Sequence, residues 1–443
     1  MAKQTSIGIA LIGPGVVGRG VLAILREQSQ LLLNRSGLSI DVKHVVTRDV
    51  TRHADLAAHY ALTDDASKAI NDPSVSIVIE TMGGTTVAST LIEAALKAGK
   101  HVVTANKALL ALKGPELFSL AKQHNAAIGF EASCGGGIPI IDALTRGLIG
   151  NRIDALIGII NGTCNFILTQ MSAKGQSYSD ALKDAQQLGY AEADPTLDVN
   201  GRDTAQKLAI LSTLAFNVQV NESDICVSGI DTLQADDIRF ADELGYKIKL
   251  LAIAERSGES LSLRVGPTLV HRGNLMADVN GSFNAISVYG HAIGHQFFYG
   301  RGAGQTPTAS AVVADIIGVA MGTIPHAFSR LNVYPGRLEN VRALPVEALR
   351  SRYYLRVTAG DVPGVFAQIT AAFAKQSISL SGVFQKETSP GASTGATTVP
   401  VVITTHVTTE GAIRAAIKEI DALPAIQKTT ACLRIVEDPT EFA

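Results

Sequence analysis

A carboxylate and an ammonium group stand four residues apart in residues 198–207, which read Asp-Val-Asn-Gly-Arg-Asp-Thr-Ala-Gln-Lys. They belong to Asp203 and Lys207, at the start of an apolar pattern with the period of a helix. Residues four apart share one helix face, so the two groups are expected to lie side by side. A lysine held beside an acid can exchange a proton with a substrate oxygen. The alternative is a solvated helix ion pair with no function.

A glycine-rich turn near the N-terminus has the order of elements that a dinucleotide-binding fold needs. Residues 7–12 form an apolar strand pattern, residues 13–18 read Gly-Pro-Gly-Val-Val-Gly, and a helical pattern follows at once. The first two glycines permit a tight turn and close approach to a pyrophosphate, and the third lets the helix pack on the strand. The phosphate charge then meets the positive end of the helix. Further strand patterns follow at 42–46, 76–81, 101–104 and 127–132. This alternation predicts an α/β fold with a Rossmann-like domain.

Arg48 follows the second predicted strand, where dinucleotide enzymes bind the adenosine ribose. An acid at this place accepts the ribose 2′-hydroxyl of NAD, whereas an arginine suits the 2′-phosphate of NADP. Arg48, with Arg52 close by, favours NADP, and Asp49 leaves NAD as the alternative. Both arginines are also compatible with solvated loop charges.

The loops after the third and fourth predicted strands should line the ligand crevice, since ligands bind at the carboxyl ends of parallel strands. The third strand ends in Thr81-Met82 and two glycines, and the fourth ends in Thr104, followed by Ala, Asn and Lys107. We expect Lys107 to project toward the nicotinamide. A solvated lysine at a helix start is the alternative.

After about residue 150 the pattern changes to a strand at 153–160 and a helix beginning at 166–171. Between them stand Gly162 and Thr163, whose amides at a helix start suit a substrate carboxylate. The acidic stretch that precedes Asp203 contains Glu192 and Asp198. These carboxylates are candidates for binding a substrate ammonium group, and a solvated acidic loop is the alternative.

A second glycine loop, residues 299–304, reads Tyr-Gly-Arg-Gly-Ala-Gly and precedes a helical stretch at 309–321. By its position we expect this loop to return to the cofactor. His291 and His295 are four apart, but Gly290 and Gly294 argue against a helix there, so a metal site is not predicted.

From Tyr353 onward the chain has the order strand, helix, strand, strand, helix, strand, which is the ferredoxin-like order. The two middle strands are joined by a loop at 388–398 that is rich in Ser, Thr and Gly. Its composition lets it move.

Composition restricts the class of protein. The chain has 443 residues, 46% hydrophobic and 18% charged, with a formal net charge of −2. There is no basic field for nucleic acid, no long apolar run for a membrane span and no signal-peptide region before the first strand. The four cysteines are scattered, without metal-ligand spacing. We therefore expect a cytoplasmic protein of about three domains that binds neither nucleic acid nor membrane.

Together these motifs resemble the homoserine dehydrogenases, in the form that ends in an ACT regulatory domain. The resemblance covers essentially the whole chain. Its most specific pieces are residues 104–107, 131–139, 161–163, 189–194, 198–207 and 302–304. It implies an NAD(P)-dependent interconversion of L-homoserine and L-aspartate 4-semialdehyde, a branch step toward threonine, methionine and isoleucine. The implied domains are a Rossmann-like NAD(P)-binding domain at 1–135 joined by a helix at 305–335, an α+β catalytic and dimerisation domain at 136–304, and a ferredoxin-like ACT domain at 350–437.

The resemblance also implies roles for individual residues. Lys207 would give a proton to the aldehyde oxygen, Asp203 would orient it, and Lys107 would bind beside the nicotinamide, although sequence leaves open which lysine moves the proton. Cofactor contacts are implied at Gly13, Gly15, Val16, Val17, Gly18, Arg48, Thr81, Met82, Thr104, Lys107 and Gly304. Substrate contacts are implied at Gly162, Thr163, Tyr190, Glu192, Asp198, Asp203 and Lys207. A monovalent cation of the Na⁺ type is implied at the backbone carbonyls of Glu131, Cys134, Gly136 and Ile138.

The ACT unit resembles amino-acid sensors that bind effectors between paired domains. We therefore expect threonine as an effector and a homodimer or homotetramer. One alternative is a phosphorylating semialdehyde dehydrogenase, which needs a nucleophilic thiol at Cys134 or Cys164. Another is a non-catalytic sensor of NADPH and an amino acid, which has no use for a proton donor.

Overall fold

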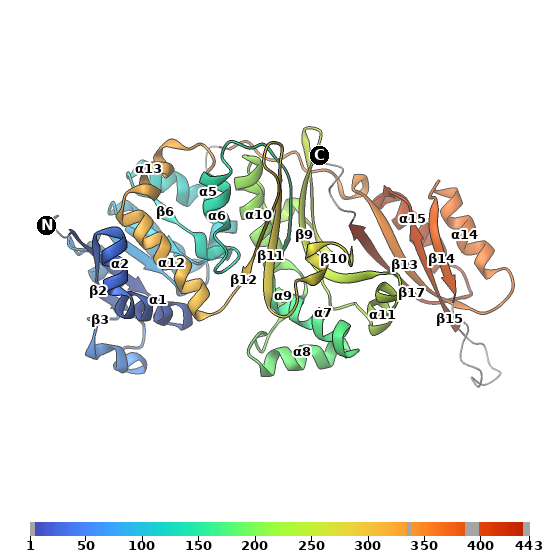
Figure 1. The fold of residues 1–443 in the computed structure, drawn as a ribbon, viewed down its shortest axis with the longest axis horizontal. Coiled ribbons are helices and arrows are strands. Elements are labelled where there is room, and N and C mark those ends of the chain that lie inside the picture. The colour runs from blue at the N-terminus through green and yellow to red at the C-terminus, as the bar shows by residue number, and fades with distance from the viewer. Residues whose placement is uncertain (1–4, 335–337, 386–397, 437–443) are drawn as a thin grey trace. The chain divides into compact units, whose positions relative to one another are not determined.

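A computed structural model describes residues 5–334, 338–385 and 398–436. The chain divides into two compact units (Figure 1). Unit 1 comprises residues 1–162, 203–225 and 282–341, and unit 2 comprises residues 163–202, 226–281 and 342–443. Each unit is therefore assembled from separate stretches of the chain.

The N-terminal part of unit 1 is a parallel sheet with the strand order β3-β2-β1-β4-β5-β6. Its strands are β1 (Thr5–Ile12), β2 (Leu38–Val46), β3 (Leu62–Thr63), β4 (Ile77–Glu80), β5 (His101–Thr104) and β6 (Ile128–Gly129). The helical segments between them are α1 (Val16–Glu27), α2 (Ser29–Ser36), η1 (Thr51–Ala58), α3 (Ala66–Asn71), α4 (Thr86–Lys97) and α5 (Lys107–Gln123). This is the doubly wound order of dinucleotide-binding folds, so the predicted Rossmann-like domain is confirmed.

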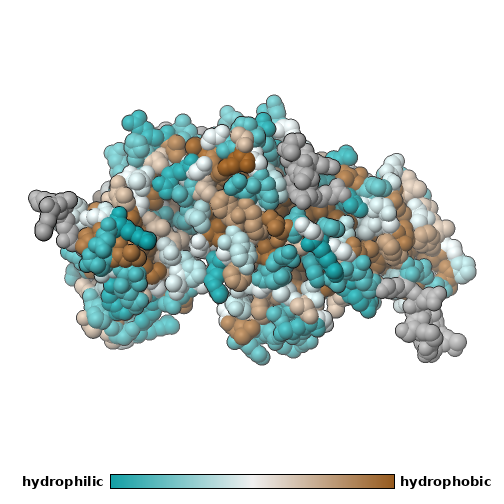
Figure 2. All heavy atoms as spheres, viewed as in Figure 1, coloured by the Kyte–Doolittle hydropathy of each residue, from teal (hydrophilic) through white to brown (hydrophobic). Residues whose placement is uncertain are grey.

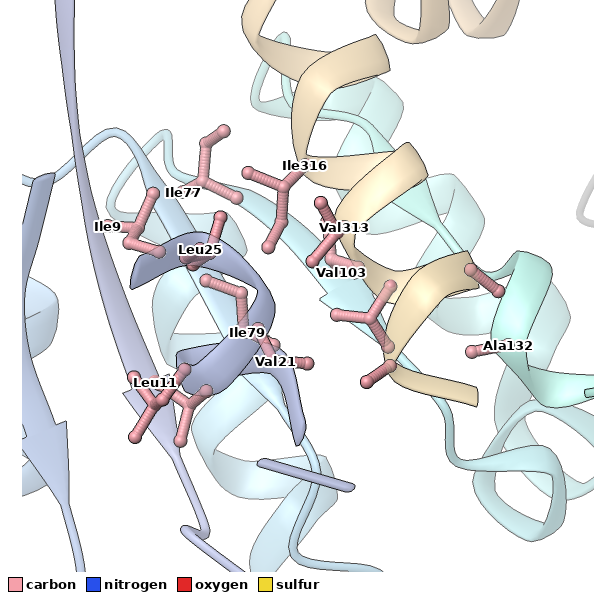
Figure 3. Packing of buried hydrophobic residues seen from close by; sticks show 14 of the residues in the cluster. Ile9, Leu11, Val21, Leu25, Ile77, Ile79, Val103, Ala132, Val313 and Ile316 are labelled. Atoms are coloured by element: carbon pink, nitrogen blue, oxygen red, sulfur yellow. The ribbon is translucent and has the colours of Figure 1, made fainter. Parts of the chain in front are cut away.

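A helix from late in the chain completes this domain. Apolar side chains of α1 and of α12 (Gln305–Ala320) pack together over the buried strands (Figure 3). The core includes Ile9, Leu11, Val21, Leu25, Ile77, Ile79, Val103, Val312, Val313 and Ile316. The helical stretch predicted at 309–321 thus lies on the first sheet.

Two elements of unit 1 around residues 127–132 and 305–335 differ from the sequence-based expectation. The single helix expected at 305–335 is two helices, α12 and α13 (Thr323–Arg330), that meet at 77°. The break falls at Gly322, whose φ of +79° ends α12. The strand expected at 127–132 ends at Gly129, and the short turn η2 (Glu131–Ser133) follows. The strand ends there because of a contact with a residue far away in the sequence: the amide of Glu131 donates to Asp315 of α12 at 2.8 Å.

The rest of unit 1 carries a second sheet and a buried helix. Strands β7 (Ile153–Ile159), β11 (Phe283–Gly290) and β12 (Gly294–Arg301) are antiparallel in the order β12-β11-β7. The helices are α6 (Ile140–Asp142), the π-turn η3 (Ala143–Gly147), α10 (Arg202–Phe216) and η4 (Glu222–Asp224). His291 lies in the turn between β11 and β12, and His295 in β12 meets the Ser287 hydroxyl at 2.9 Å. The two histidines are therefore not on a helix.

Unit 2 begins with helices α7 (Gly162–Lys174), α8 (Tyr178–Gln187) and α9 (Thr196–Val199). They are followed by β8 (Cys226–Val227), α11 (Ala235–Glu243), β9 (Tyr246–Ser257), β10 (Ser260–His271) and η5 (Leu275–Asp278). Strands β9 and β10 form a long antiparallel hairpin. Helix α7 begins at Gly162, before the range 166–171 that the apolar pattern predicted.

The C-terminal part of unit 2 has the predicted order of elements. They are η6 (Val346–Ala348), β13 (Arg350–Gly360), α14 (Val365–Lys375), β14 (Leu380–Gln385), β15 (Thr398–Thr405), β16 (Thr408–Thr409), α15 (Glu410–Asp421) and β17 (Ile426–Val436). The strand order β17-β13-β15-β14 is that of a ferredoxin-like sheet, and α14 and α15 pack on it around Tyr353, Ile369 and Ile413. β17 also pairs in parallel with β10, so this sheet continues into the β9–β10 hairpin. The predicted mobile loop at 388–398 lies outside the described residues, except for Thr398.

Among the residues that the structure describes, no single helix is long and apolar enough to cross a membrane. Only α12 and α13 taken together reach that length and hydropathy, and they are bent at their junction. The apolar side chains of α12 are those of the core described above. Figure 2 shows hydrophilic side chains spread over the viewed face of each unit, with apolar ones between them.

Candidate active site

Asp203 lies between two lysines in unit 1. Its Oδ2 meets the Lys207 Nζ at 2.8 Å, and its Oδ1 meets the Lys107 Nζ at 3.1 Å. The Asp203 side chain is 8% exposed, that of Lys207 13% and that of Lys107 37%. Because the pair is buried and extends to a second lysine, it is not an ordinary surface ion pair. We refer to these three residues as the Lys–Asp–Lys cluster.

Two further groups hold the cluster, and sequence reasoning gave neither a role. The Asn161 side chain donates to Asp203 Oδ2 at 2.8 Å, and Lys207 donates to the backbone oxygen of Ile160 at 2.8 Å. An ammonium group has three N–H donors, so these contacts leave Lys207 a donor for a ligand. Asn161 directly precedes Gly162 and Thr163, which were predicted as substrate contacts. This neighbouring position could have indicated a role for Asn161.

The charge of the cluster follows from its surroundings. Burial raises the pKa of the Asp203 carboxyl, but the two neighbouring ammonium groups and the hydrogen bonds from Lys207 and Asn161 outweigh it and lower this pKa to about 2. Asp203 is therefore ionised at neutral pH. One carboxylate with two ammonium groups has an excess positive charge, which suits an oxygen that becomes negative during a reaction.

The sequence positions Asp203 and Lys207 through α10. Gly201 turns the chain with a φ of +84°, and the Asn200 side chain accepts from the amide of Arg202 at the start of the helix. Behind this start α10 buries residues on every face. A helix enclosed in this way holds its polar first turn inside the unit, so the i,i+4 pair becomes a buried site.

Lys107 is positioned by a buried hydrogen-bond chain. It is the first residue of α5, and its neighbour Asn106 caps the helix by accepting from the amide of Leu109 at 3.1 Å. Thr104 accepts from the Asn106 amide at 3.0 Å and donates to Glu80 at 2.7 Å. Glu80 also accepts from the amides of Met82 and Gly83, so it ties the β4 loop to the β5 loop. Thr104 is thus a positioning residue by geometry, and Glu80 and Asn106 were given no role from sequence.

A cleft of about 510 Å³ lies at the carboxyl ends of β1, β2 and β4. It is lined by Gly13, Gly15, Arg48, Thr81 and Met82, together with Thr47, Asp49, Arg52 and His53. A Cβ at Gly13 would lie 2.8 Å from Met82, and one at Gly18 would lie 2.4 Å from the Gly13 oxygen. A Cβ at Gly15 would meet nothing within 4 Å, so its backbone faces open space. Val16 and Val17 form the first turn of α1 beside it.

The predicted cofactor residues Thr104, Lys107 and Gly304 lie elsewhere in unit 1 and do not line this cleft. Gly304 precedes α12 and lines a separate open depression with Arg301 and Gln305. Lys107 belongs to the Lys–Asp–Lys cluster and is not among the residues that line the Gly13 cleft. The Asp49 carboxylate accepts from the Thr51 hydroxyl at 2.6 Å and from the Arg52 amide at 3.0 Å. Both hydrogen bonds use Asp49 Oδ1 and close the turn before η1. Arg48 and Arg52 are the arginines that line the cleft, which also contains Asp64.

The predicted substrate residues around α7 divide into a packed set and an exposed one. Thr163 donates to the backbone oxygen of Tyr190 at 2.6 Å, and the Tyr190 ring lies 4.9 Å from that of Phe166. The backbone oxygen of Asp198 accepts from the Cys164 thiol at 3.3 Å. In unit 2 the start of α7 is thus in contact with the Tyr190 and Asp198 segments. Glu192 is exposed on the loop between them.

Residues 131–138 form the loop in which the cation was expected. Gly135 and Gly136 have φ values of +72° and +58°, so the loop turns sharply at a place that favours glycine. The Glu131 carboxylate accepts from the amides of Ile141 and Asp142, both at 2.8 Å. Its side chain therefore caps α6, and its backbone oxygen is the group left to act as a ligand. In the described parts of the chain, no three His, Cys, Asp or Glu side chains gather as a metal site.

The two thiols that a thioester mechanism would need are enclosed. Cys134 and Cys164 are both fully buried. Burial raises the pKa of the Cys134 thiol to about 12, so it stays protonated at neutral pH. A protonated, buried thiol is a poor nucleophile.

A dinucleotide-binding fold with a buried Lys–Asp–Lys cluster beside its βα loops defines an NAD(P)-dependent oxidoreductase. Comparison with known proteins agrees. The chain matches the family models described as homoserine dehydrogenase over residues 139–317, homoserine dehydrogenase NAD binding domain over 13–131, and ACT domain over 353–425. The chain belongs to the homoserine dehydrogenase family, whose enzymes act on a CH–OH group.

Relatives match over nearly their whole length. A homoserine dehydrogenase from Neisseria gonorrhoeae is 41% identical over 97% of this chain and 98% of that protein. The crystal structure of one from Thiobacillus denitrificans has a TM-score of 0.91 at 43% identity and covers 98% of this chain and 100% of that chain. A hyperthermophilic archaeal homoserine dehydrogenase in complex with NADPH has a TM-score of 0.61 at 26% identity, covering 72% of this chain and 98% of that chain.

Proposed function

We propose that the protein reduces L-aspartate 4-semialdehyde to L-homoserine with NADPH, reversibly, as a step toward threonine, methionine and isoleucine. The observation that carries this proposal is the buried Lys–Asp–Lys cluster in a chain of the homoserine dehydrogenase family. The substrate is an aldehyde at one end and an α-amino acid at the other. The site must therefore supply a proton at one end and bind two opposite charges at the other.

The cluster supplies the proton. When bound, reduced nicotinamide provides a hydride for the aldehyde carbon. Lys207 gives a proton to the aldehyde oxygen as negative charge develops there, because its Nζ is fixed by Asp203 and Ile160 with one donor left over. Asp203 orients Lys207 and keeps the net charge of the cluster moderate. Lys107, the more exposed lysine, binds beside the nicotinamide and stabilises the same oxygen.

The α-amino acid end is assigned to residues around α7. The amides of Gly162 and Thr163 at the helix start bind the substrate carboxylate. Glu192 and Asp198 are assigned to the ammonium group, and Tyr190, whose backbone oxygen accepts from the Thr163 hydroxyl, is a further proposed substrate contact. The support for this assignment is the packing of Thr163, Tyr190 and Phe166 at the helix start.

The preferred cofactor in this proposal is NADP. Arg48 and Arg52 line the Gly13 cleft, whereas Oδ1 of the Asp49 carboxylate is engaged in the turn before η1. An arginine pair binds a 2′-phosphate with charge-assisted hydrogen bonds, and a carboxylate engaged elsewhere is a weak acceptor for a 2′-hydroxyl. Gly13, Gly15, Val16, Val17, Gly18, Thr81, Met82, Thr104, Lys107 and Gly304 complete the proposed cofactor contacts.

A monovalent cation, Na⁺ in the first instance, is proposed at the backbone oxygens of Glu131, Cys134, Gly136 and Ile138. The sharp turn at Gly135–Gly136 supports such a role. The oxygens of Glu131 and Ile138 also accept backbone amides, at 3.5 and 2.8 Å, but a carbonyl oxygen has a second lone pair for a cation. Neutral oxygens suit a hard cation of low charge. When bound, the cation would hold the loop in one conformation.

The ACT domain is proposed to bind threonine as a feedback effector, in a homodimer or homotetramer. The domain shares its sheet with β10 through β17, which gives an effector a physical connection to the rest of unit 2. A chain truncated near residue 345 would lose β13 and β17 together, so the effector is best tested on the full chain. Isothermal titration with threonine, with alanine as control, and light scattering to measure the oligomer check these two points.

The experiment that tests the activity is the appearance of reduced cofactor absorbance when the protein meets L-homoserine and NADP without phosphate. Aspartate semialdehyde with NADPH tests the reverse direction. We expect turnover in both. Cofactor binding without turnover of either substrate would contradict the proposal.

A further inference from the structure

Asn284 is a buried polar side chain that has no part in the proposed reaction. It lies on β11, opposite Gly300 of β12, and is 1% exposed. Neither its Oδ1 nor its Nδ2 has a hydrogen-bond partner in the described part of the chain. A buried polar group left in this state costs about 1–3 kcal/mol, and native proteins satisfy such groups with water or a ligand. The amide of Asn284 therefore marks a place for a bound polar species.

The position of Asn284 is against the loop that was proposed to hold the cation. A Cβ added to Gly302 would lie 1.9 Å from Asn284 Nδ2, so the backbone at residue 302 directly abuts the amide. A Cβ added to Gly136 would lie 2.4 Å from the backbone oxygen of Gly302. The amide of Gly137 also donates to the Arg301 oxygen at 3.0 Å. The loop 135–138 thus packs on the end of β12, beside which the Asn284 side chain is buried.

Gly300, two residues before Gly302, also lies close to loop 135–138. A Cβ at Gly300 would lie 3.1 Å from Ile138 Cγ1, and Gly300 is the residue that pairs with Asn284. Gly300 of β12 and Gly302, the residue after the last one of β12, therefore let loop 135–138 and the Asn284 amide approach the backbone closely. A larger side chain at either position would separate the two.

We propose that Asn284 supplies a side-chain ligand, its carboxamide oxygen, to the monovalent cation held by loop 131–138. This inference rests on the proposed cation site. A carboxamide oxygen is a neutral hard donor, like the peptide oxygens of the loop. The one acidic side chain in the loop, Glu131, is engaged by two helix amides. The resulting ligand set carries no formal charge, which favours Na⁺ or K⁺ over a divalent ion.

A cation with a coordinated water would give a partner to both the oxygen and the nitrogen of the Asn284 amide. The oxygen ligates the cation, and the amide N–H groups donate to a water in its shell. Glycine at 302 is required because any Cβ there would displace the amide.

The test is thermal unfolding of the full-length protein in the absence of substrate and cofactor, titrated with NaCl against choline chloride at constant ionic strength. The wild-type unfolding temperature should rise with Na⁺. Fitting that rise to the linkage relation, in which stability grows as RT ln(1 + [Na⁺]/Kd), gives the Na⁺ concentration at half-occupancy, here called the Na⁺ midpoint. Asn284→Ala should raise that midpoint by about tenfold, the change that corresponds to a loss of about 1.4 kcal/mol of binding free energy. Ser212→Ala is the matched control, since Ser212 Oγ is also buried without a partner among the described residues but lies on α10.

Asn284→Asp is the second variant, and it tests the charge argument even if the alanine variant does not fold. It keeps an oxygen of the same reach and adds a negative charge. We expect it to lower the Na⁺ midpoint and to make the unfolding temperature respond to Ca²⁺, which should not affect the wild type. Calcium titration of both proteins measures this directly.

The outcomes separate the inference from its premise. A wild type that responds to Na⁺ and an Asn284→Ala variant with the same midpoint would overturn the role of Asn284 and leave the loop site standing; the amide would then hold water alone. A wild type indifferent to Na⁺ would overturn the cation site and the inference with it. Neither result bears on dehydrogenase turnover, which is measured separately.

Discussion

Breaking the buried ion pair between Arg356 and Asp237 should strongly destabilise unit 2. Arg356 of β13 reaches α11 with two hydrogen bonds to the Asp237 carboxylate, at 2.7 and 3.0 Å. The side chains are 8% and 1% exposed. Gln234 accepts a further bond from Arg356 at 3.0 Å, and the Tyr354 hydroxyl donates to Asp237 at 3.3 Å. The ferredoxin-like domain is thus fixed to the rest of its unit through a fully enclosed charge.

Replacing Arg356 by methionine keeps the apolar part of the side chain and leaves the Asp237 charge buried. Removing one partner of such a pair costs about 3–5 kcal/mol, most of it the penalty of the stranded charge. For a unit of this size that corresponds to a drop of about 10 °C in the unfolding temperature. The double variant Arg356→Met/Asp237→Asn removes the charge as well, so we expect it to recover more than half of the loss.

Scanning calorimetry is the assay, because it separates the transitions of two units that need not unfold together. The matched control is Arg342→Met, since the Arg342–Glu259 pair has the same chemistry with side chains 75% and 87% exposed. That variant should change stability by less than about 1 kcal/mol. If Arg356→Met unfolds at the wild-type temperature, the ferredoxin-like domain is not anchored as described.

Four other variants test separate features of the protein. Arg48→Ala should lower kcat/KM with NADP by about tenfold or more while the value with NAD stays within about twofold, because only the 2′-phosphate loses a charge-assisted contact; an equal loss with both cofactors would refute the assignment. Cys134→Ala and Cys164→Ala should each keep most of the steady-state rate, and loss of all turnover in either with the fold intact would favour a thiol mechanism. Burial, with Lys247 nearby, lowers the pKa of Lys249 to about 8. The unfolded chain therefore binds more protons than the folded one between pH 8 and the ordinary lysine value of about 10.4, so wild-type stability relative to Lys249→Met should rise by up to about 3 kcal/mol across that interval. Chemical unfolding at several pH values measures this slope, and a flat difference would mean that Lys249 titrates normally.

Sequence reasoning succeeded where the determinant was local. The turn at 13–18 needs glycine for its own backbone, so the dinucleotide loop could be predicted from those residues alone. Asp203 and Lys207 meet because four residues make about one helical turn. The ferredoxin-like order was legible because each of its elements has its own apolar period.

The features that sequence reasoning missed depend on residues far apart in the chain. β6 is short because Asp315, on a helix that returns from the end of unit 1, binds the amide of Glu131. Lys107 completes the cluster through a contact with Asp203 that no local pattern contains. Asn284 looks like any polar strand residue until its burial beside Gly302 is known.

The turnover of Lys207→Ala tests whether Lys207 is the proton donor of the reaction. Steady-state reduction of aspartate semialdehyde should fall by about 100- to 10,000-fold, the contribution of a positioned proton donor. NADPH affinity, measured by fluorescence titration, should stay within about twofold of the wild type. Lys183→Ala, which removes a lysine with a 70% exposed side chain, is the control and should turn over normally. Near-normal turnover of Lys207→Ala would contradict the assignment of the Lys–Asp–Lys cluster as the proton-transfer site.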